Sequence, residues 1–170
     1  MKIFGLWAAL TSILYVMQTS LLPIFNWNGI STNFMLLLTV STAFLFGHRY
    51  GVFIGFSAGL IQDLSTGSYF GCDVFSYMFI GLICGKFSDH IFKDQFFLPV
   101  IASIFATVIH YFIMVAFIYL LGYPLDIKWN VQQILLPMVV YQLLFAYPVH
   151  KIVYEFNKKL NPKSKYSITN

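Results

Sequence analysis

Apolar stretches separated by short polar segments follow one another along almost the whole chain. A helix that crosses a membrane needs about 20 predominantly apolar residues, and somewhat fewer where the bilayer is thin. The pattern therefore predicts an all-α, polytopic integral membrane protein with six transmembrane helices, at about 3–25, 30–47, 51–64, 72–85, 96–122 and 131–147. We expect these helices to form a single domain, 1–150.

Polar segments of a few residues mark the predicted connections between the helices. NWNG (26–29) and the segment 65–71 are rich in residues that favour turns. A charge interrupts the pattern at HRY (48–50), and KFSDHIFKDQ (86–95) reads as a charged loop. A further loop is expected at 123–129.

The last predicted span contains a proline and is followed by a basic tail, 151–170. Pro137 removes one backbone hydrogen bond, so we expect it to kink that span. In the tail, Ile152, Phe156 and Leu160 recur every four residues, with lysines on other faces. This spacing favours a helix that lies at the inner headgroup layer. This helix is either an ordinary anchor whose lysines keep it on the inner side of the membrane or a docking helix for a cytosolic partner.

Composition supports a membrane protein and excludes most soluble classes. The chain has 170 residues, of which 59% are hydrophobic and only 9% charged. Soluble domains carry roughly 25% charged residues. Binding of nucleic acid would need a basic face with many phosphate contacts, and the sequence offers none outside the tail. The apolar N-terminal stretch has no clear cleavage site, so we interpret it as a retained first helix rather than a signal peptide.

The placement of Lys and Arg predicts the orientation in the membrane. Cytoplasmic loops carry an excess of these residues. With both termini in the cytoplasm, Lys128 alone among the 10 Lys and Arg residues lies outside. The inner side then holds Lys2, Arg49, Lys86, Lys93, Lys151, Lys158, Lys159, Lys163 and Lys165. A five-span alternative, with 51–85 partly re-entrant, is disfavoured because it moves the lysines of the tail to the outside.

Two rows of small residues flank the acidic stretch GLIQDLSTGSYFG (59–71). Residues four apart lie on one ridge of a helix, and glycine on such a ridge lets another backbone approach closely. The rows serve either packing within the chain or an interface with a second protein. The candidate residues for this structural or partner-interface role are Gly51, Gly55, Gly59, Asp63, Gly71, Asp73, Gly81 and Gly85.

Asp63 is the most informative single residue because a charge within a membrane span is costly. It can be an acid at headgroup level, a hydrogen-bond acceptor for the turn 65–71 or for a partner, or a carrier of protons or ions. A carrier would need a second ionisable group in the membrane, and His110 is the one plausible second group. A lone histidine in a bundle is more often hydrogen-bonded to a neighbour than part of a relay.

Other reactive residues do not form a recognisable site. His48, His90 and His150 lack the spacing of metal ligands. Cys72 and Cys84 fall roughly 18 Å apart on one helix, so they cannot form a disulfide with each other. Asp63 and Asp73 could form an acidic pair, but no nucleophile accompanies them. We therefore expect neither an enzyme nor a cofactor.

The segment GVFIGFSAGLIQDLSTGSYFGCDVFSYMFIGLICG (51–85) resembles the signature region of the bacterial rod shape-determining MreD family. It combines a glycine-rich helix that ends in Gly-Leu-x-x-Asp, a short turn, a Phe-Gly pair and a second glycine-bearing helix. These features fall on Gly55, Gly59, Leu60, Asp63, Phe70, Gly71 and Gly81. Outside 51–85 the resemblance rests on length, number of spans and the basic tail.

The resemblance implies a non-enzymatic scaffold of the cell-elongation machinery in the inner membrane. The expected partners are an MreC-like single-span protein, the actin-like MreB, the glycosyltransferase and transpeptidase that build lateral-wall peptidoglycan, and membrane lipid. It also implies a fold similar to the substrate-binding subunits of energy-coupling-factor vitamin transporters. Such a subunit is the alternative function, although the short first outer loop and the absence of an Ala-x-x-x-Ala motif in the first helix disfavour it.

Overall fold

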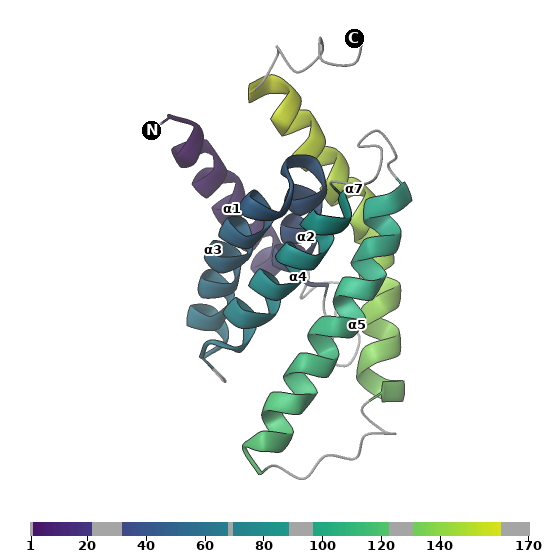
Figure 1. The fold of residues 1–170 in the computed structure, drawn as a ribbon. Helices are drawn as coiled ribbons and strands as arrows, with labels where there is room; N and C mark the ends of the chain where they lie inside the picture. The colour runs from purple at the N-terminus through teal and green to yellow at the C-terminus, as the bar shows by residue number, and fades with distance from the viewer. Residues whose placement is uncertain (1, 22–31, 68–69, 89–96, 123–130, 161–170) are drawn as a thin grey trace.

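The computed structural model describes residues 2–21, 32–67, 70–88, 97–122 and 131–160, and every regular element within them is helical. Figure 1 shows these helices packed side by side as a bundle. The all-α prediction is therefore confirmed for this part of the chain. In order, the elements are α1 (Lys2–Leu21), α2 (Phe34–Phe46), α3 (His48–Thr66), α4 (Cys72–Ser88), α5 (Phe97–Leu120), the short π-helix η2 (Val131–Leu135) and α7 (Leu136–Leu160).

The centre of the bundle is α2, which packs against α1, α3, α4, α5 and α7. Its residues are buried from Phe34 to Phe44. A helix that is apolar on all sides is one that neighbours surround completely, and α2 fits this rule. Its 13 residues span only about 20 Å, which is shorter than the hydrocarbon core of a bilayer.

The tightest pair of helices is α3 and α4, which run antiparallel on one side of α2 (Figure 1). Both are longer than expected. The predicted break at HRY is wrong, because Gly47 alone separates α2 from α3 and His48 is already helical. At the other end, α4 continues to Ser88, so the predicted loop at 86–95 begins with helical residues.

The last two long helices, α5 and α7, pack against each other. Pro137 lies at the second residue of α7, directly after the π-helix η2, and the kink expected there stays a prediction. The proline inside the helix is Pro148, and α7 continues beyond it to Leu160. Because the sixth span was expected to end at residue 147, its predicted end is wrong.

The start of the predicted tail belongs to the bundle. Val153 is completely buried, and the ring of Phe156 meets that of Trp7 on α1 with centroids 5.5 Å apart. Residues 151–160 therefore continue α7 and pack on α1, rather than forming a separate helix at the headgroup layer. The predicted loops at 26–29 and 123–129 and the end of the tail, 161–170, lie outside the described residues.

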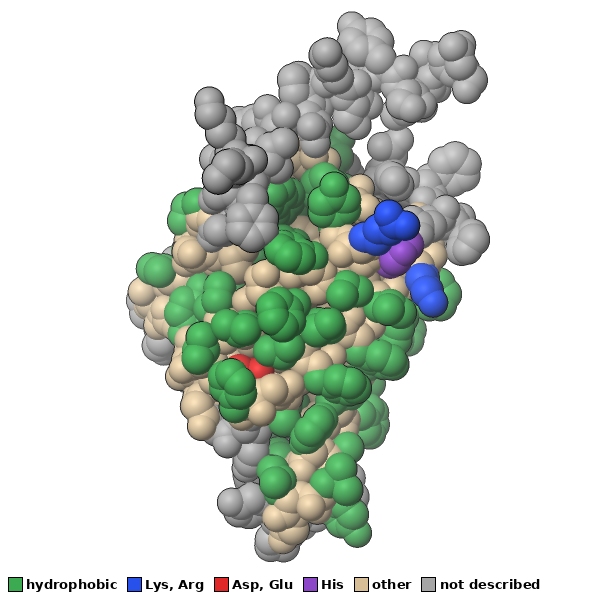
Figure 2. All heavy atoms as spheres, turned by 60° about the vertical axis from the view of Figure 1, so that its left-hand side comes forward, with side chains coloured by type: hydrophobic (Ala, Val, Ile, Leu, Met, Phe, Trp, Pro, Cys, Tyr) green, Lys and Arg blue, Asp and Glu red, His purple; other side chains and the backbone are tan. Residues whose placement is uncertain are grey.

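Two of the described helical stretches are long and apolar enough to cross a membrane. They are Leu98–Leu120, with a mean hydropathy of 2.3, and Val131–Lys158, with a mean hydropathy of 1.3. The surface is also apolar: Figure 2 shows hydrophobic side chains over most of the face around α3, with Lys and Arg gathered at one end. Large apolar residues such as Phe53, Phe75 and Phe79 are exposed on α3 and α4. A contiguous apolar exterior of this kind suits contact with lipid.

Candidate functional site

The glycine row of α3 faces the backbone of α4. A Cβ atom added to Gly55 would come within 2.6 Å of the Tyr77 carbonyl oxygen, and one added to Gly59 within 2.5 Å of the Val74 Cα. At Gly51 the added atom would meet the neighbouring helices at 2.6–2.7 Å. Real Cβ atoms do not approach other atoms so closely, so only glycine allows this separation of the helices.

The glycine row of α4 faces α3 in return. A Cβ atom on Gly81 would overlap the backbone of Gly51, and one on Gly85 would overlap the backbone of His48. The two rows thus pack against each other within one chain. Five glycines of the two rows contact neighbouring helices of the same chain in this way: Gly51, Gly55, Gly59, Gly81 and Gly85. An interface of this region with a second protein stays a prediction.

Asp63 closes the connection between α3 and α4. Its Oδ2 accepts hydrogen bonds from the backbone N–H groups of Gly71 at 2.9 Å and Val74 at 3.1 Å, and its Oδ1 accepts one from Asp73 at 3.1 Å. Its own carbonyl oxygen accepts the N–H of Gly67 at 3.0 Å. One residue therefore ends α3 and caps the beginning of α4.

The turn between these helices needs glycine at two positions. Gly67 has φ +65° and Gly71 has φ +98°, a region that residues with a side chain rarely adopt. The acceptor role expected for Asp63 is confirmed for the N–H of Gly71. The serine of the turn behaves differently, because Ser65 Oγ donates to the Ile61 carbonyl oxygen within its own helix.

The Asp63 carboxyl group is buried and is surrounded by backbone hydrogen-bond donors. The residue is only 3% exposed, yet its oxygens accept three backbone N–H groups. Hydrogen bonds to a charged acceptor are among the stronger ones. The positive end of the α4 dipole lies at the same place. A buried carboxylate thus has the partners that compensate for its loss of water.

The Asp73 carboxyl group lies next to His110 of α5. His110 Nε2 is 3.7 Å from Asp73 Oδ1, and both residues are buried. The imidazole also lies against the ring of Tyr77, with centroids 5.4 Å apart. Tyr77 in turn accepts a hydrogen bond at its hydroxyl oxygen from the side-chain amide of Asn33. Two helices, α4 and α5, and the residue before α2 therefore meet here.

Asn33 is the N-cap of α2 and connects it to two other helices. Its side-chain oxygen accepts the N–H of Leu36 at 3.0 Å. Its backbone N–H donates to Gln142 Oε1 of α7 at 3.1 Å, and its carbonyl oxygen accepts from Gln142 Nε2 at 3.3 Å. Gln18 of α1 accepts the N–H of Phe34 at 2.8 Å. The first N–H groups of a buried helix are satisfied in this way.

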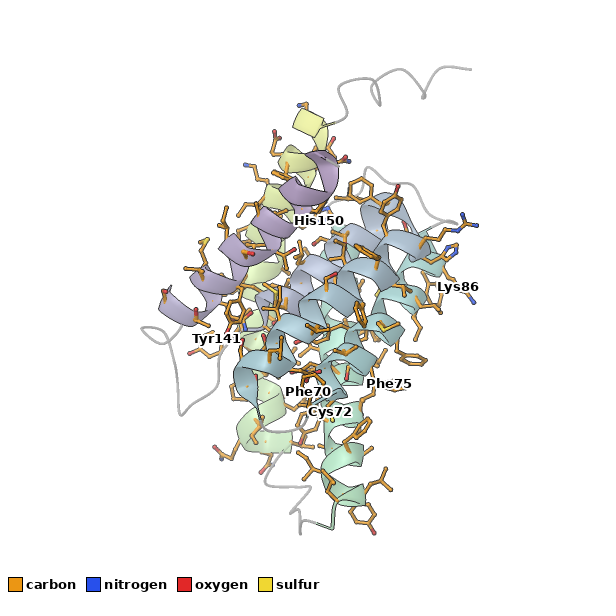
Figure 3. The ribbon with its side chains drawn as sticks, turned by 90° about the vertical axis from the view of Figure 1, so that its left-hand side faces the viewer. Phe70, Cys72, Phe75, Lys86, Tyr141 and His150 are labelled. Atoms are coloured by element: carbon orange, nitrogen blue, oxygen red, sulfur yellow. The ribbon has the colours of Figure 1, made fainter. Side chains whose placement is uncertain are left out.

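These contacts form one polar layer across the bundle, and every long helix contributes to it. Its members are Gln18, Asn33, Asp63, Asp73, Tyr77, His110 and Gln142. Asp73 lies in the first turn of α4, and Figure 3 shows Cys72 and Phe75 of that helix far from Lys86 at its other end. Sequence reasoning singled out three of the seven: Asp63, Asp73 and His110.

The other members carried weaker signals. Asn33 stands directly before an apolar run, a position where asparagine caps a helix, and this signal could have identified it. Tyr77 follows Asp73 and precedes Gly81 at a spacing of four residues, which gives no sign of a polar role. Gln18 and Gln142 are single amides in apolar stretches, and their shared target at the start of α2 depends on the three-dimensional arrangement.

The chemistry of the layer is that of hydrogen bonds and protons. Within the described residues, no group of three or more His, Cys, Asp or Glu side chains is placed to hold a metal ion. Cys72 and Cys84 are both buried and unpaired with each other, as their spacing on one helix predicts. Among the side chains described, His110 Nδ1 and Thr32 Oγ1 are buried without a hydrogen-bond partner.

Comparison with known proteins gives one match. A family model described as rod shape-determining protein MreD matches residues 1–160. No curated protein and no solved structure matches the chain. The expected similarity to the subunits of energy-coupling-factor transporters therefore stays a prediction.

Proposed function

Because the chain belongs to the rod shape-determining MreD family, we propose that it is a non-enzymatic membrane scaffold of the cell-elongation machinery. The observation that carries the proposal is the extent of the match, which includes all the described helices from α1 to α7. The family is part of the bacterial MreBCD shape-determining system and consists of membrane proteins. In this role the protein helps to organise lateral-wall peptidoglycan synthesis.

The proposed partners are an MreC-like single-span protein, the actin-like MreB, and the glycosyltransferase and transpeptidase of wall elongation. The proposed location is the inner membrane, with six spans and both termini in the cytoplasm. The packing supports a scaffold, since the polar side chains join helices to one another in the interior. Lipid and partner helices then contact the outward apolar faces, which include Phe53, Phe75 and Phe79.

Depletion of the protein in its own cells tests this function. We expect the cells to widen and become round, and a plasmid copy of the gene to restore their shape. A tagged copy should co-purify with the MreC-like protein after cross-linking in the membrane. The scaffold role would be contradicted if depleted cells kept their shape, or if an extract of the purified protein contained a stoichiometric vitamin, which would favour the transporter alternative.

A further inference from the structure

Two carboxyl groups meet at the beginning of α4, and their surroundings differ. Asp63 occupies the available N–H groups there, including the backbone N–H of Asp73. The Asp73 side chain lies in the first turn of the same helix and is 5% exposed. The N-terminus of α4 offers only a limited positive potential, and the Asp63 carboxyl group already lies against it. Two ionised carboxylates side by side in a buried site repel each other strongly.

His110 is placed to balance the second carboxyl group. Its Nε2 is the nitrogen next to Asp73, at 3.7 Å, and the residue is 5% exposed. Its other nitrogen, Nδ1, has no hydrogen-bond partner among the described residues. An acid and an imidazole in contact are neutral together when they hold one proton, whether it lies on oxygen or on nitrogen.

The other groups around the pair do not supply a compensating positive charge. Asp63 faces it from α3, and it is negative. Cys72 and Tyr77 are the ionisable neighbours on α4, and both are neutral in their ordinary state. The sequence of α2 contains no ionisable side chain, and α7 contributes the amide of Gln142 to this layer.

We propose that Asp73 and His110 share one proton and that the polar layer is therefore a proton-binding site. Loss of this proton leaves two carboxylates near one helix end with a neutral imidazole beside them, and no positive group compensates this buried charge. Gain of a second proton gives an imidazolium on a residue that is only 5% exposed, where the loss of water disfavours the charge. The bundle thus holds the pair in its singly protonated state at neutral pH. This inference goes beyond the scaffold role and does not depend on it.

Infrared and nitrogen NMR spectroscopy of the purified full-length protein in lipid at neutral pH test the proposal. The chain has only 6 Asp and Glu residues, so a carboxylic acid band can be assigned by substitution. We expect the wild type to show one protonated carboxyl group in the infrared or a protonated His110 by NMR. Asp73→Asn should abolish the acid band or return His110 to its neutral form.

Glu155→Gln is the matched control, because Glu155 is an exposed residue of α7 outside the polar layer and its replacement should leave the shared proton in place. Asp73→Glu serves if Asp73→Asn does not fold, since it should move the acid band or the His110 signal without removing the proton. The proposal is overturned if the wild type has neither an acid band nor a protonated His110. It is equally overturned if the proton signal persists unchanged in Asp73→Asn.

Discussion

At the scale of single residues, Asp63 determines how the chain reverses between two helices. Backbone that leaves a helix inside an apolar environment must find hydrogen-bond partners within the protein. One carboxylate satisfies three N–H groups at 2.9–3.1 Å, a task that would otherwise need several neutral side chains. The negative charge in an apolar chain is thus explained by the donors that surround it.

Replacement of Asp63 should therefore weaken the fold in a graded way. In Asp63→Leu, the N–H groups of Gly71, Asp73 and Val74 lose their acceptor, and we expect a loss of roughly 3 kcal/mol in unfolding free energy. In Asp63→Asn, one oxygen remains but the amide group faces a donor, so the loss should be smaller. Thermal unfolding of the purified variants in detergent measures both.

Ser65→Ala is the control for this series, because Ser65 Oγ bonds only within its own helix turn and is exposed. It should unfold as the wild type does. Stability of Asp63→Leu equal to that of Ser65→Ala would show that the carboxylate contributes little to the connection.

The residues of the polar layer show how far sequence alone could reach at this scale. A carboxyl group in an apolar helix stands out because few features except hydrogen bonds offset its cost, so Asp63 and Asp73 were predictable as candidates. Gln142 has no such signal, since a single amide can lie in many spans. Its contact with Asn33 joins residues 109 positions apart, and only the packing of α7 on α2 brings them together.

At the scale of helices, the glycine rows of α3 and α4 allow backbone-to-backbone contact. Association of helices in lipid cannot rely on hydrophobic burial, because lipid tails are as apolar as leucine. Close approach increases dispersion contacts along the whole length of both helices. The rows are complementary, so each glycine of one helix faces the main chain of the other.

Addition of a single methyl group to this contact should be destabilising. In Gly55→Ala, the new Cβ would lie 2.6 Å from the Tyr77 carbonyl oxygen, so the helices must separate. We expect a loss of roughly 1–3 kcal/mol, the usual cost of overpacking, in the same unfolding measurement. Leu82→Ala, on the outer face of α4, removes more atoms but leaves the contact between the two backbones unchanged. Its loss of unfolding free energy should therefore be far smaller. The reverse order of stability would contradict the proposed packing.

Hydropathy predicted the number and approximate places of the helices, but not which of them forms the core. The stretch 30–47 was expected to be a span like the others, whereas α2 is buried on all sides. The two environments select the same residues, since lipid and protein interior are both apolar. The end of α7 was also missed, since the last span was expected to end at residue 147. Val153 and Phe156 nevertheless continue the buried face.

At the scale of the whole molecule, charge and helix direction predict one orientation. Arg49 lies at the beginning of α3 and Lys86 near the end of the antiparallel α4, so both are at one end of the bundle. The start of α1 and the end of α7 lie near each other, as the contact of Trp7 with Phe156 requires (Figure 1). The positive-inside rule places the end that carries the basic residues in the cytoplasm.

Reporter fusions test this orientation, with both termini inside and six crossings. A reporter that is active only in the periplasm should show activity when inserted within 124–128 and none when fused after Asn170. The physical reason is that moving Arg49 and Lys86 to the outer side would leave the outer loops richer in basic residues than the inner ones, against the usual bias. The same two fusions in the double variant Arg49→Glu/Lys86→Glu should give a mixed pattern of reporter activity. The excess of basic residues on the inner side is then smaller, while the lysines of the tail remain. Activity at the tail together with silence in the loop would reverse the topology, and activity at both sites would indicate an even number of crossings between them.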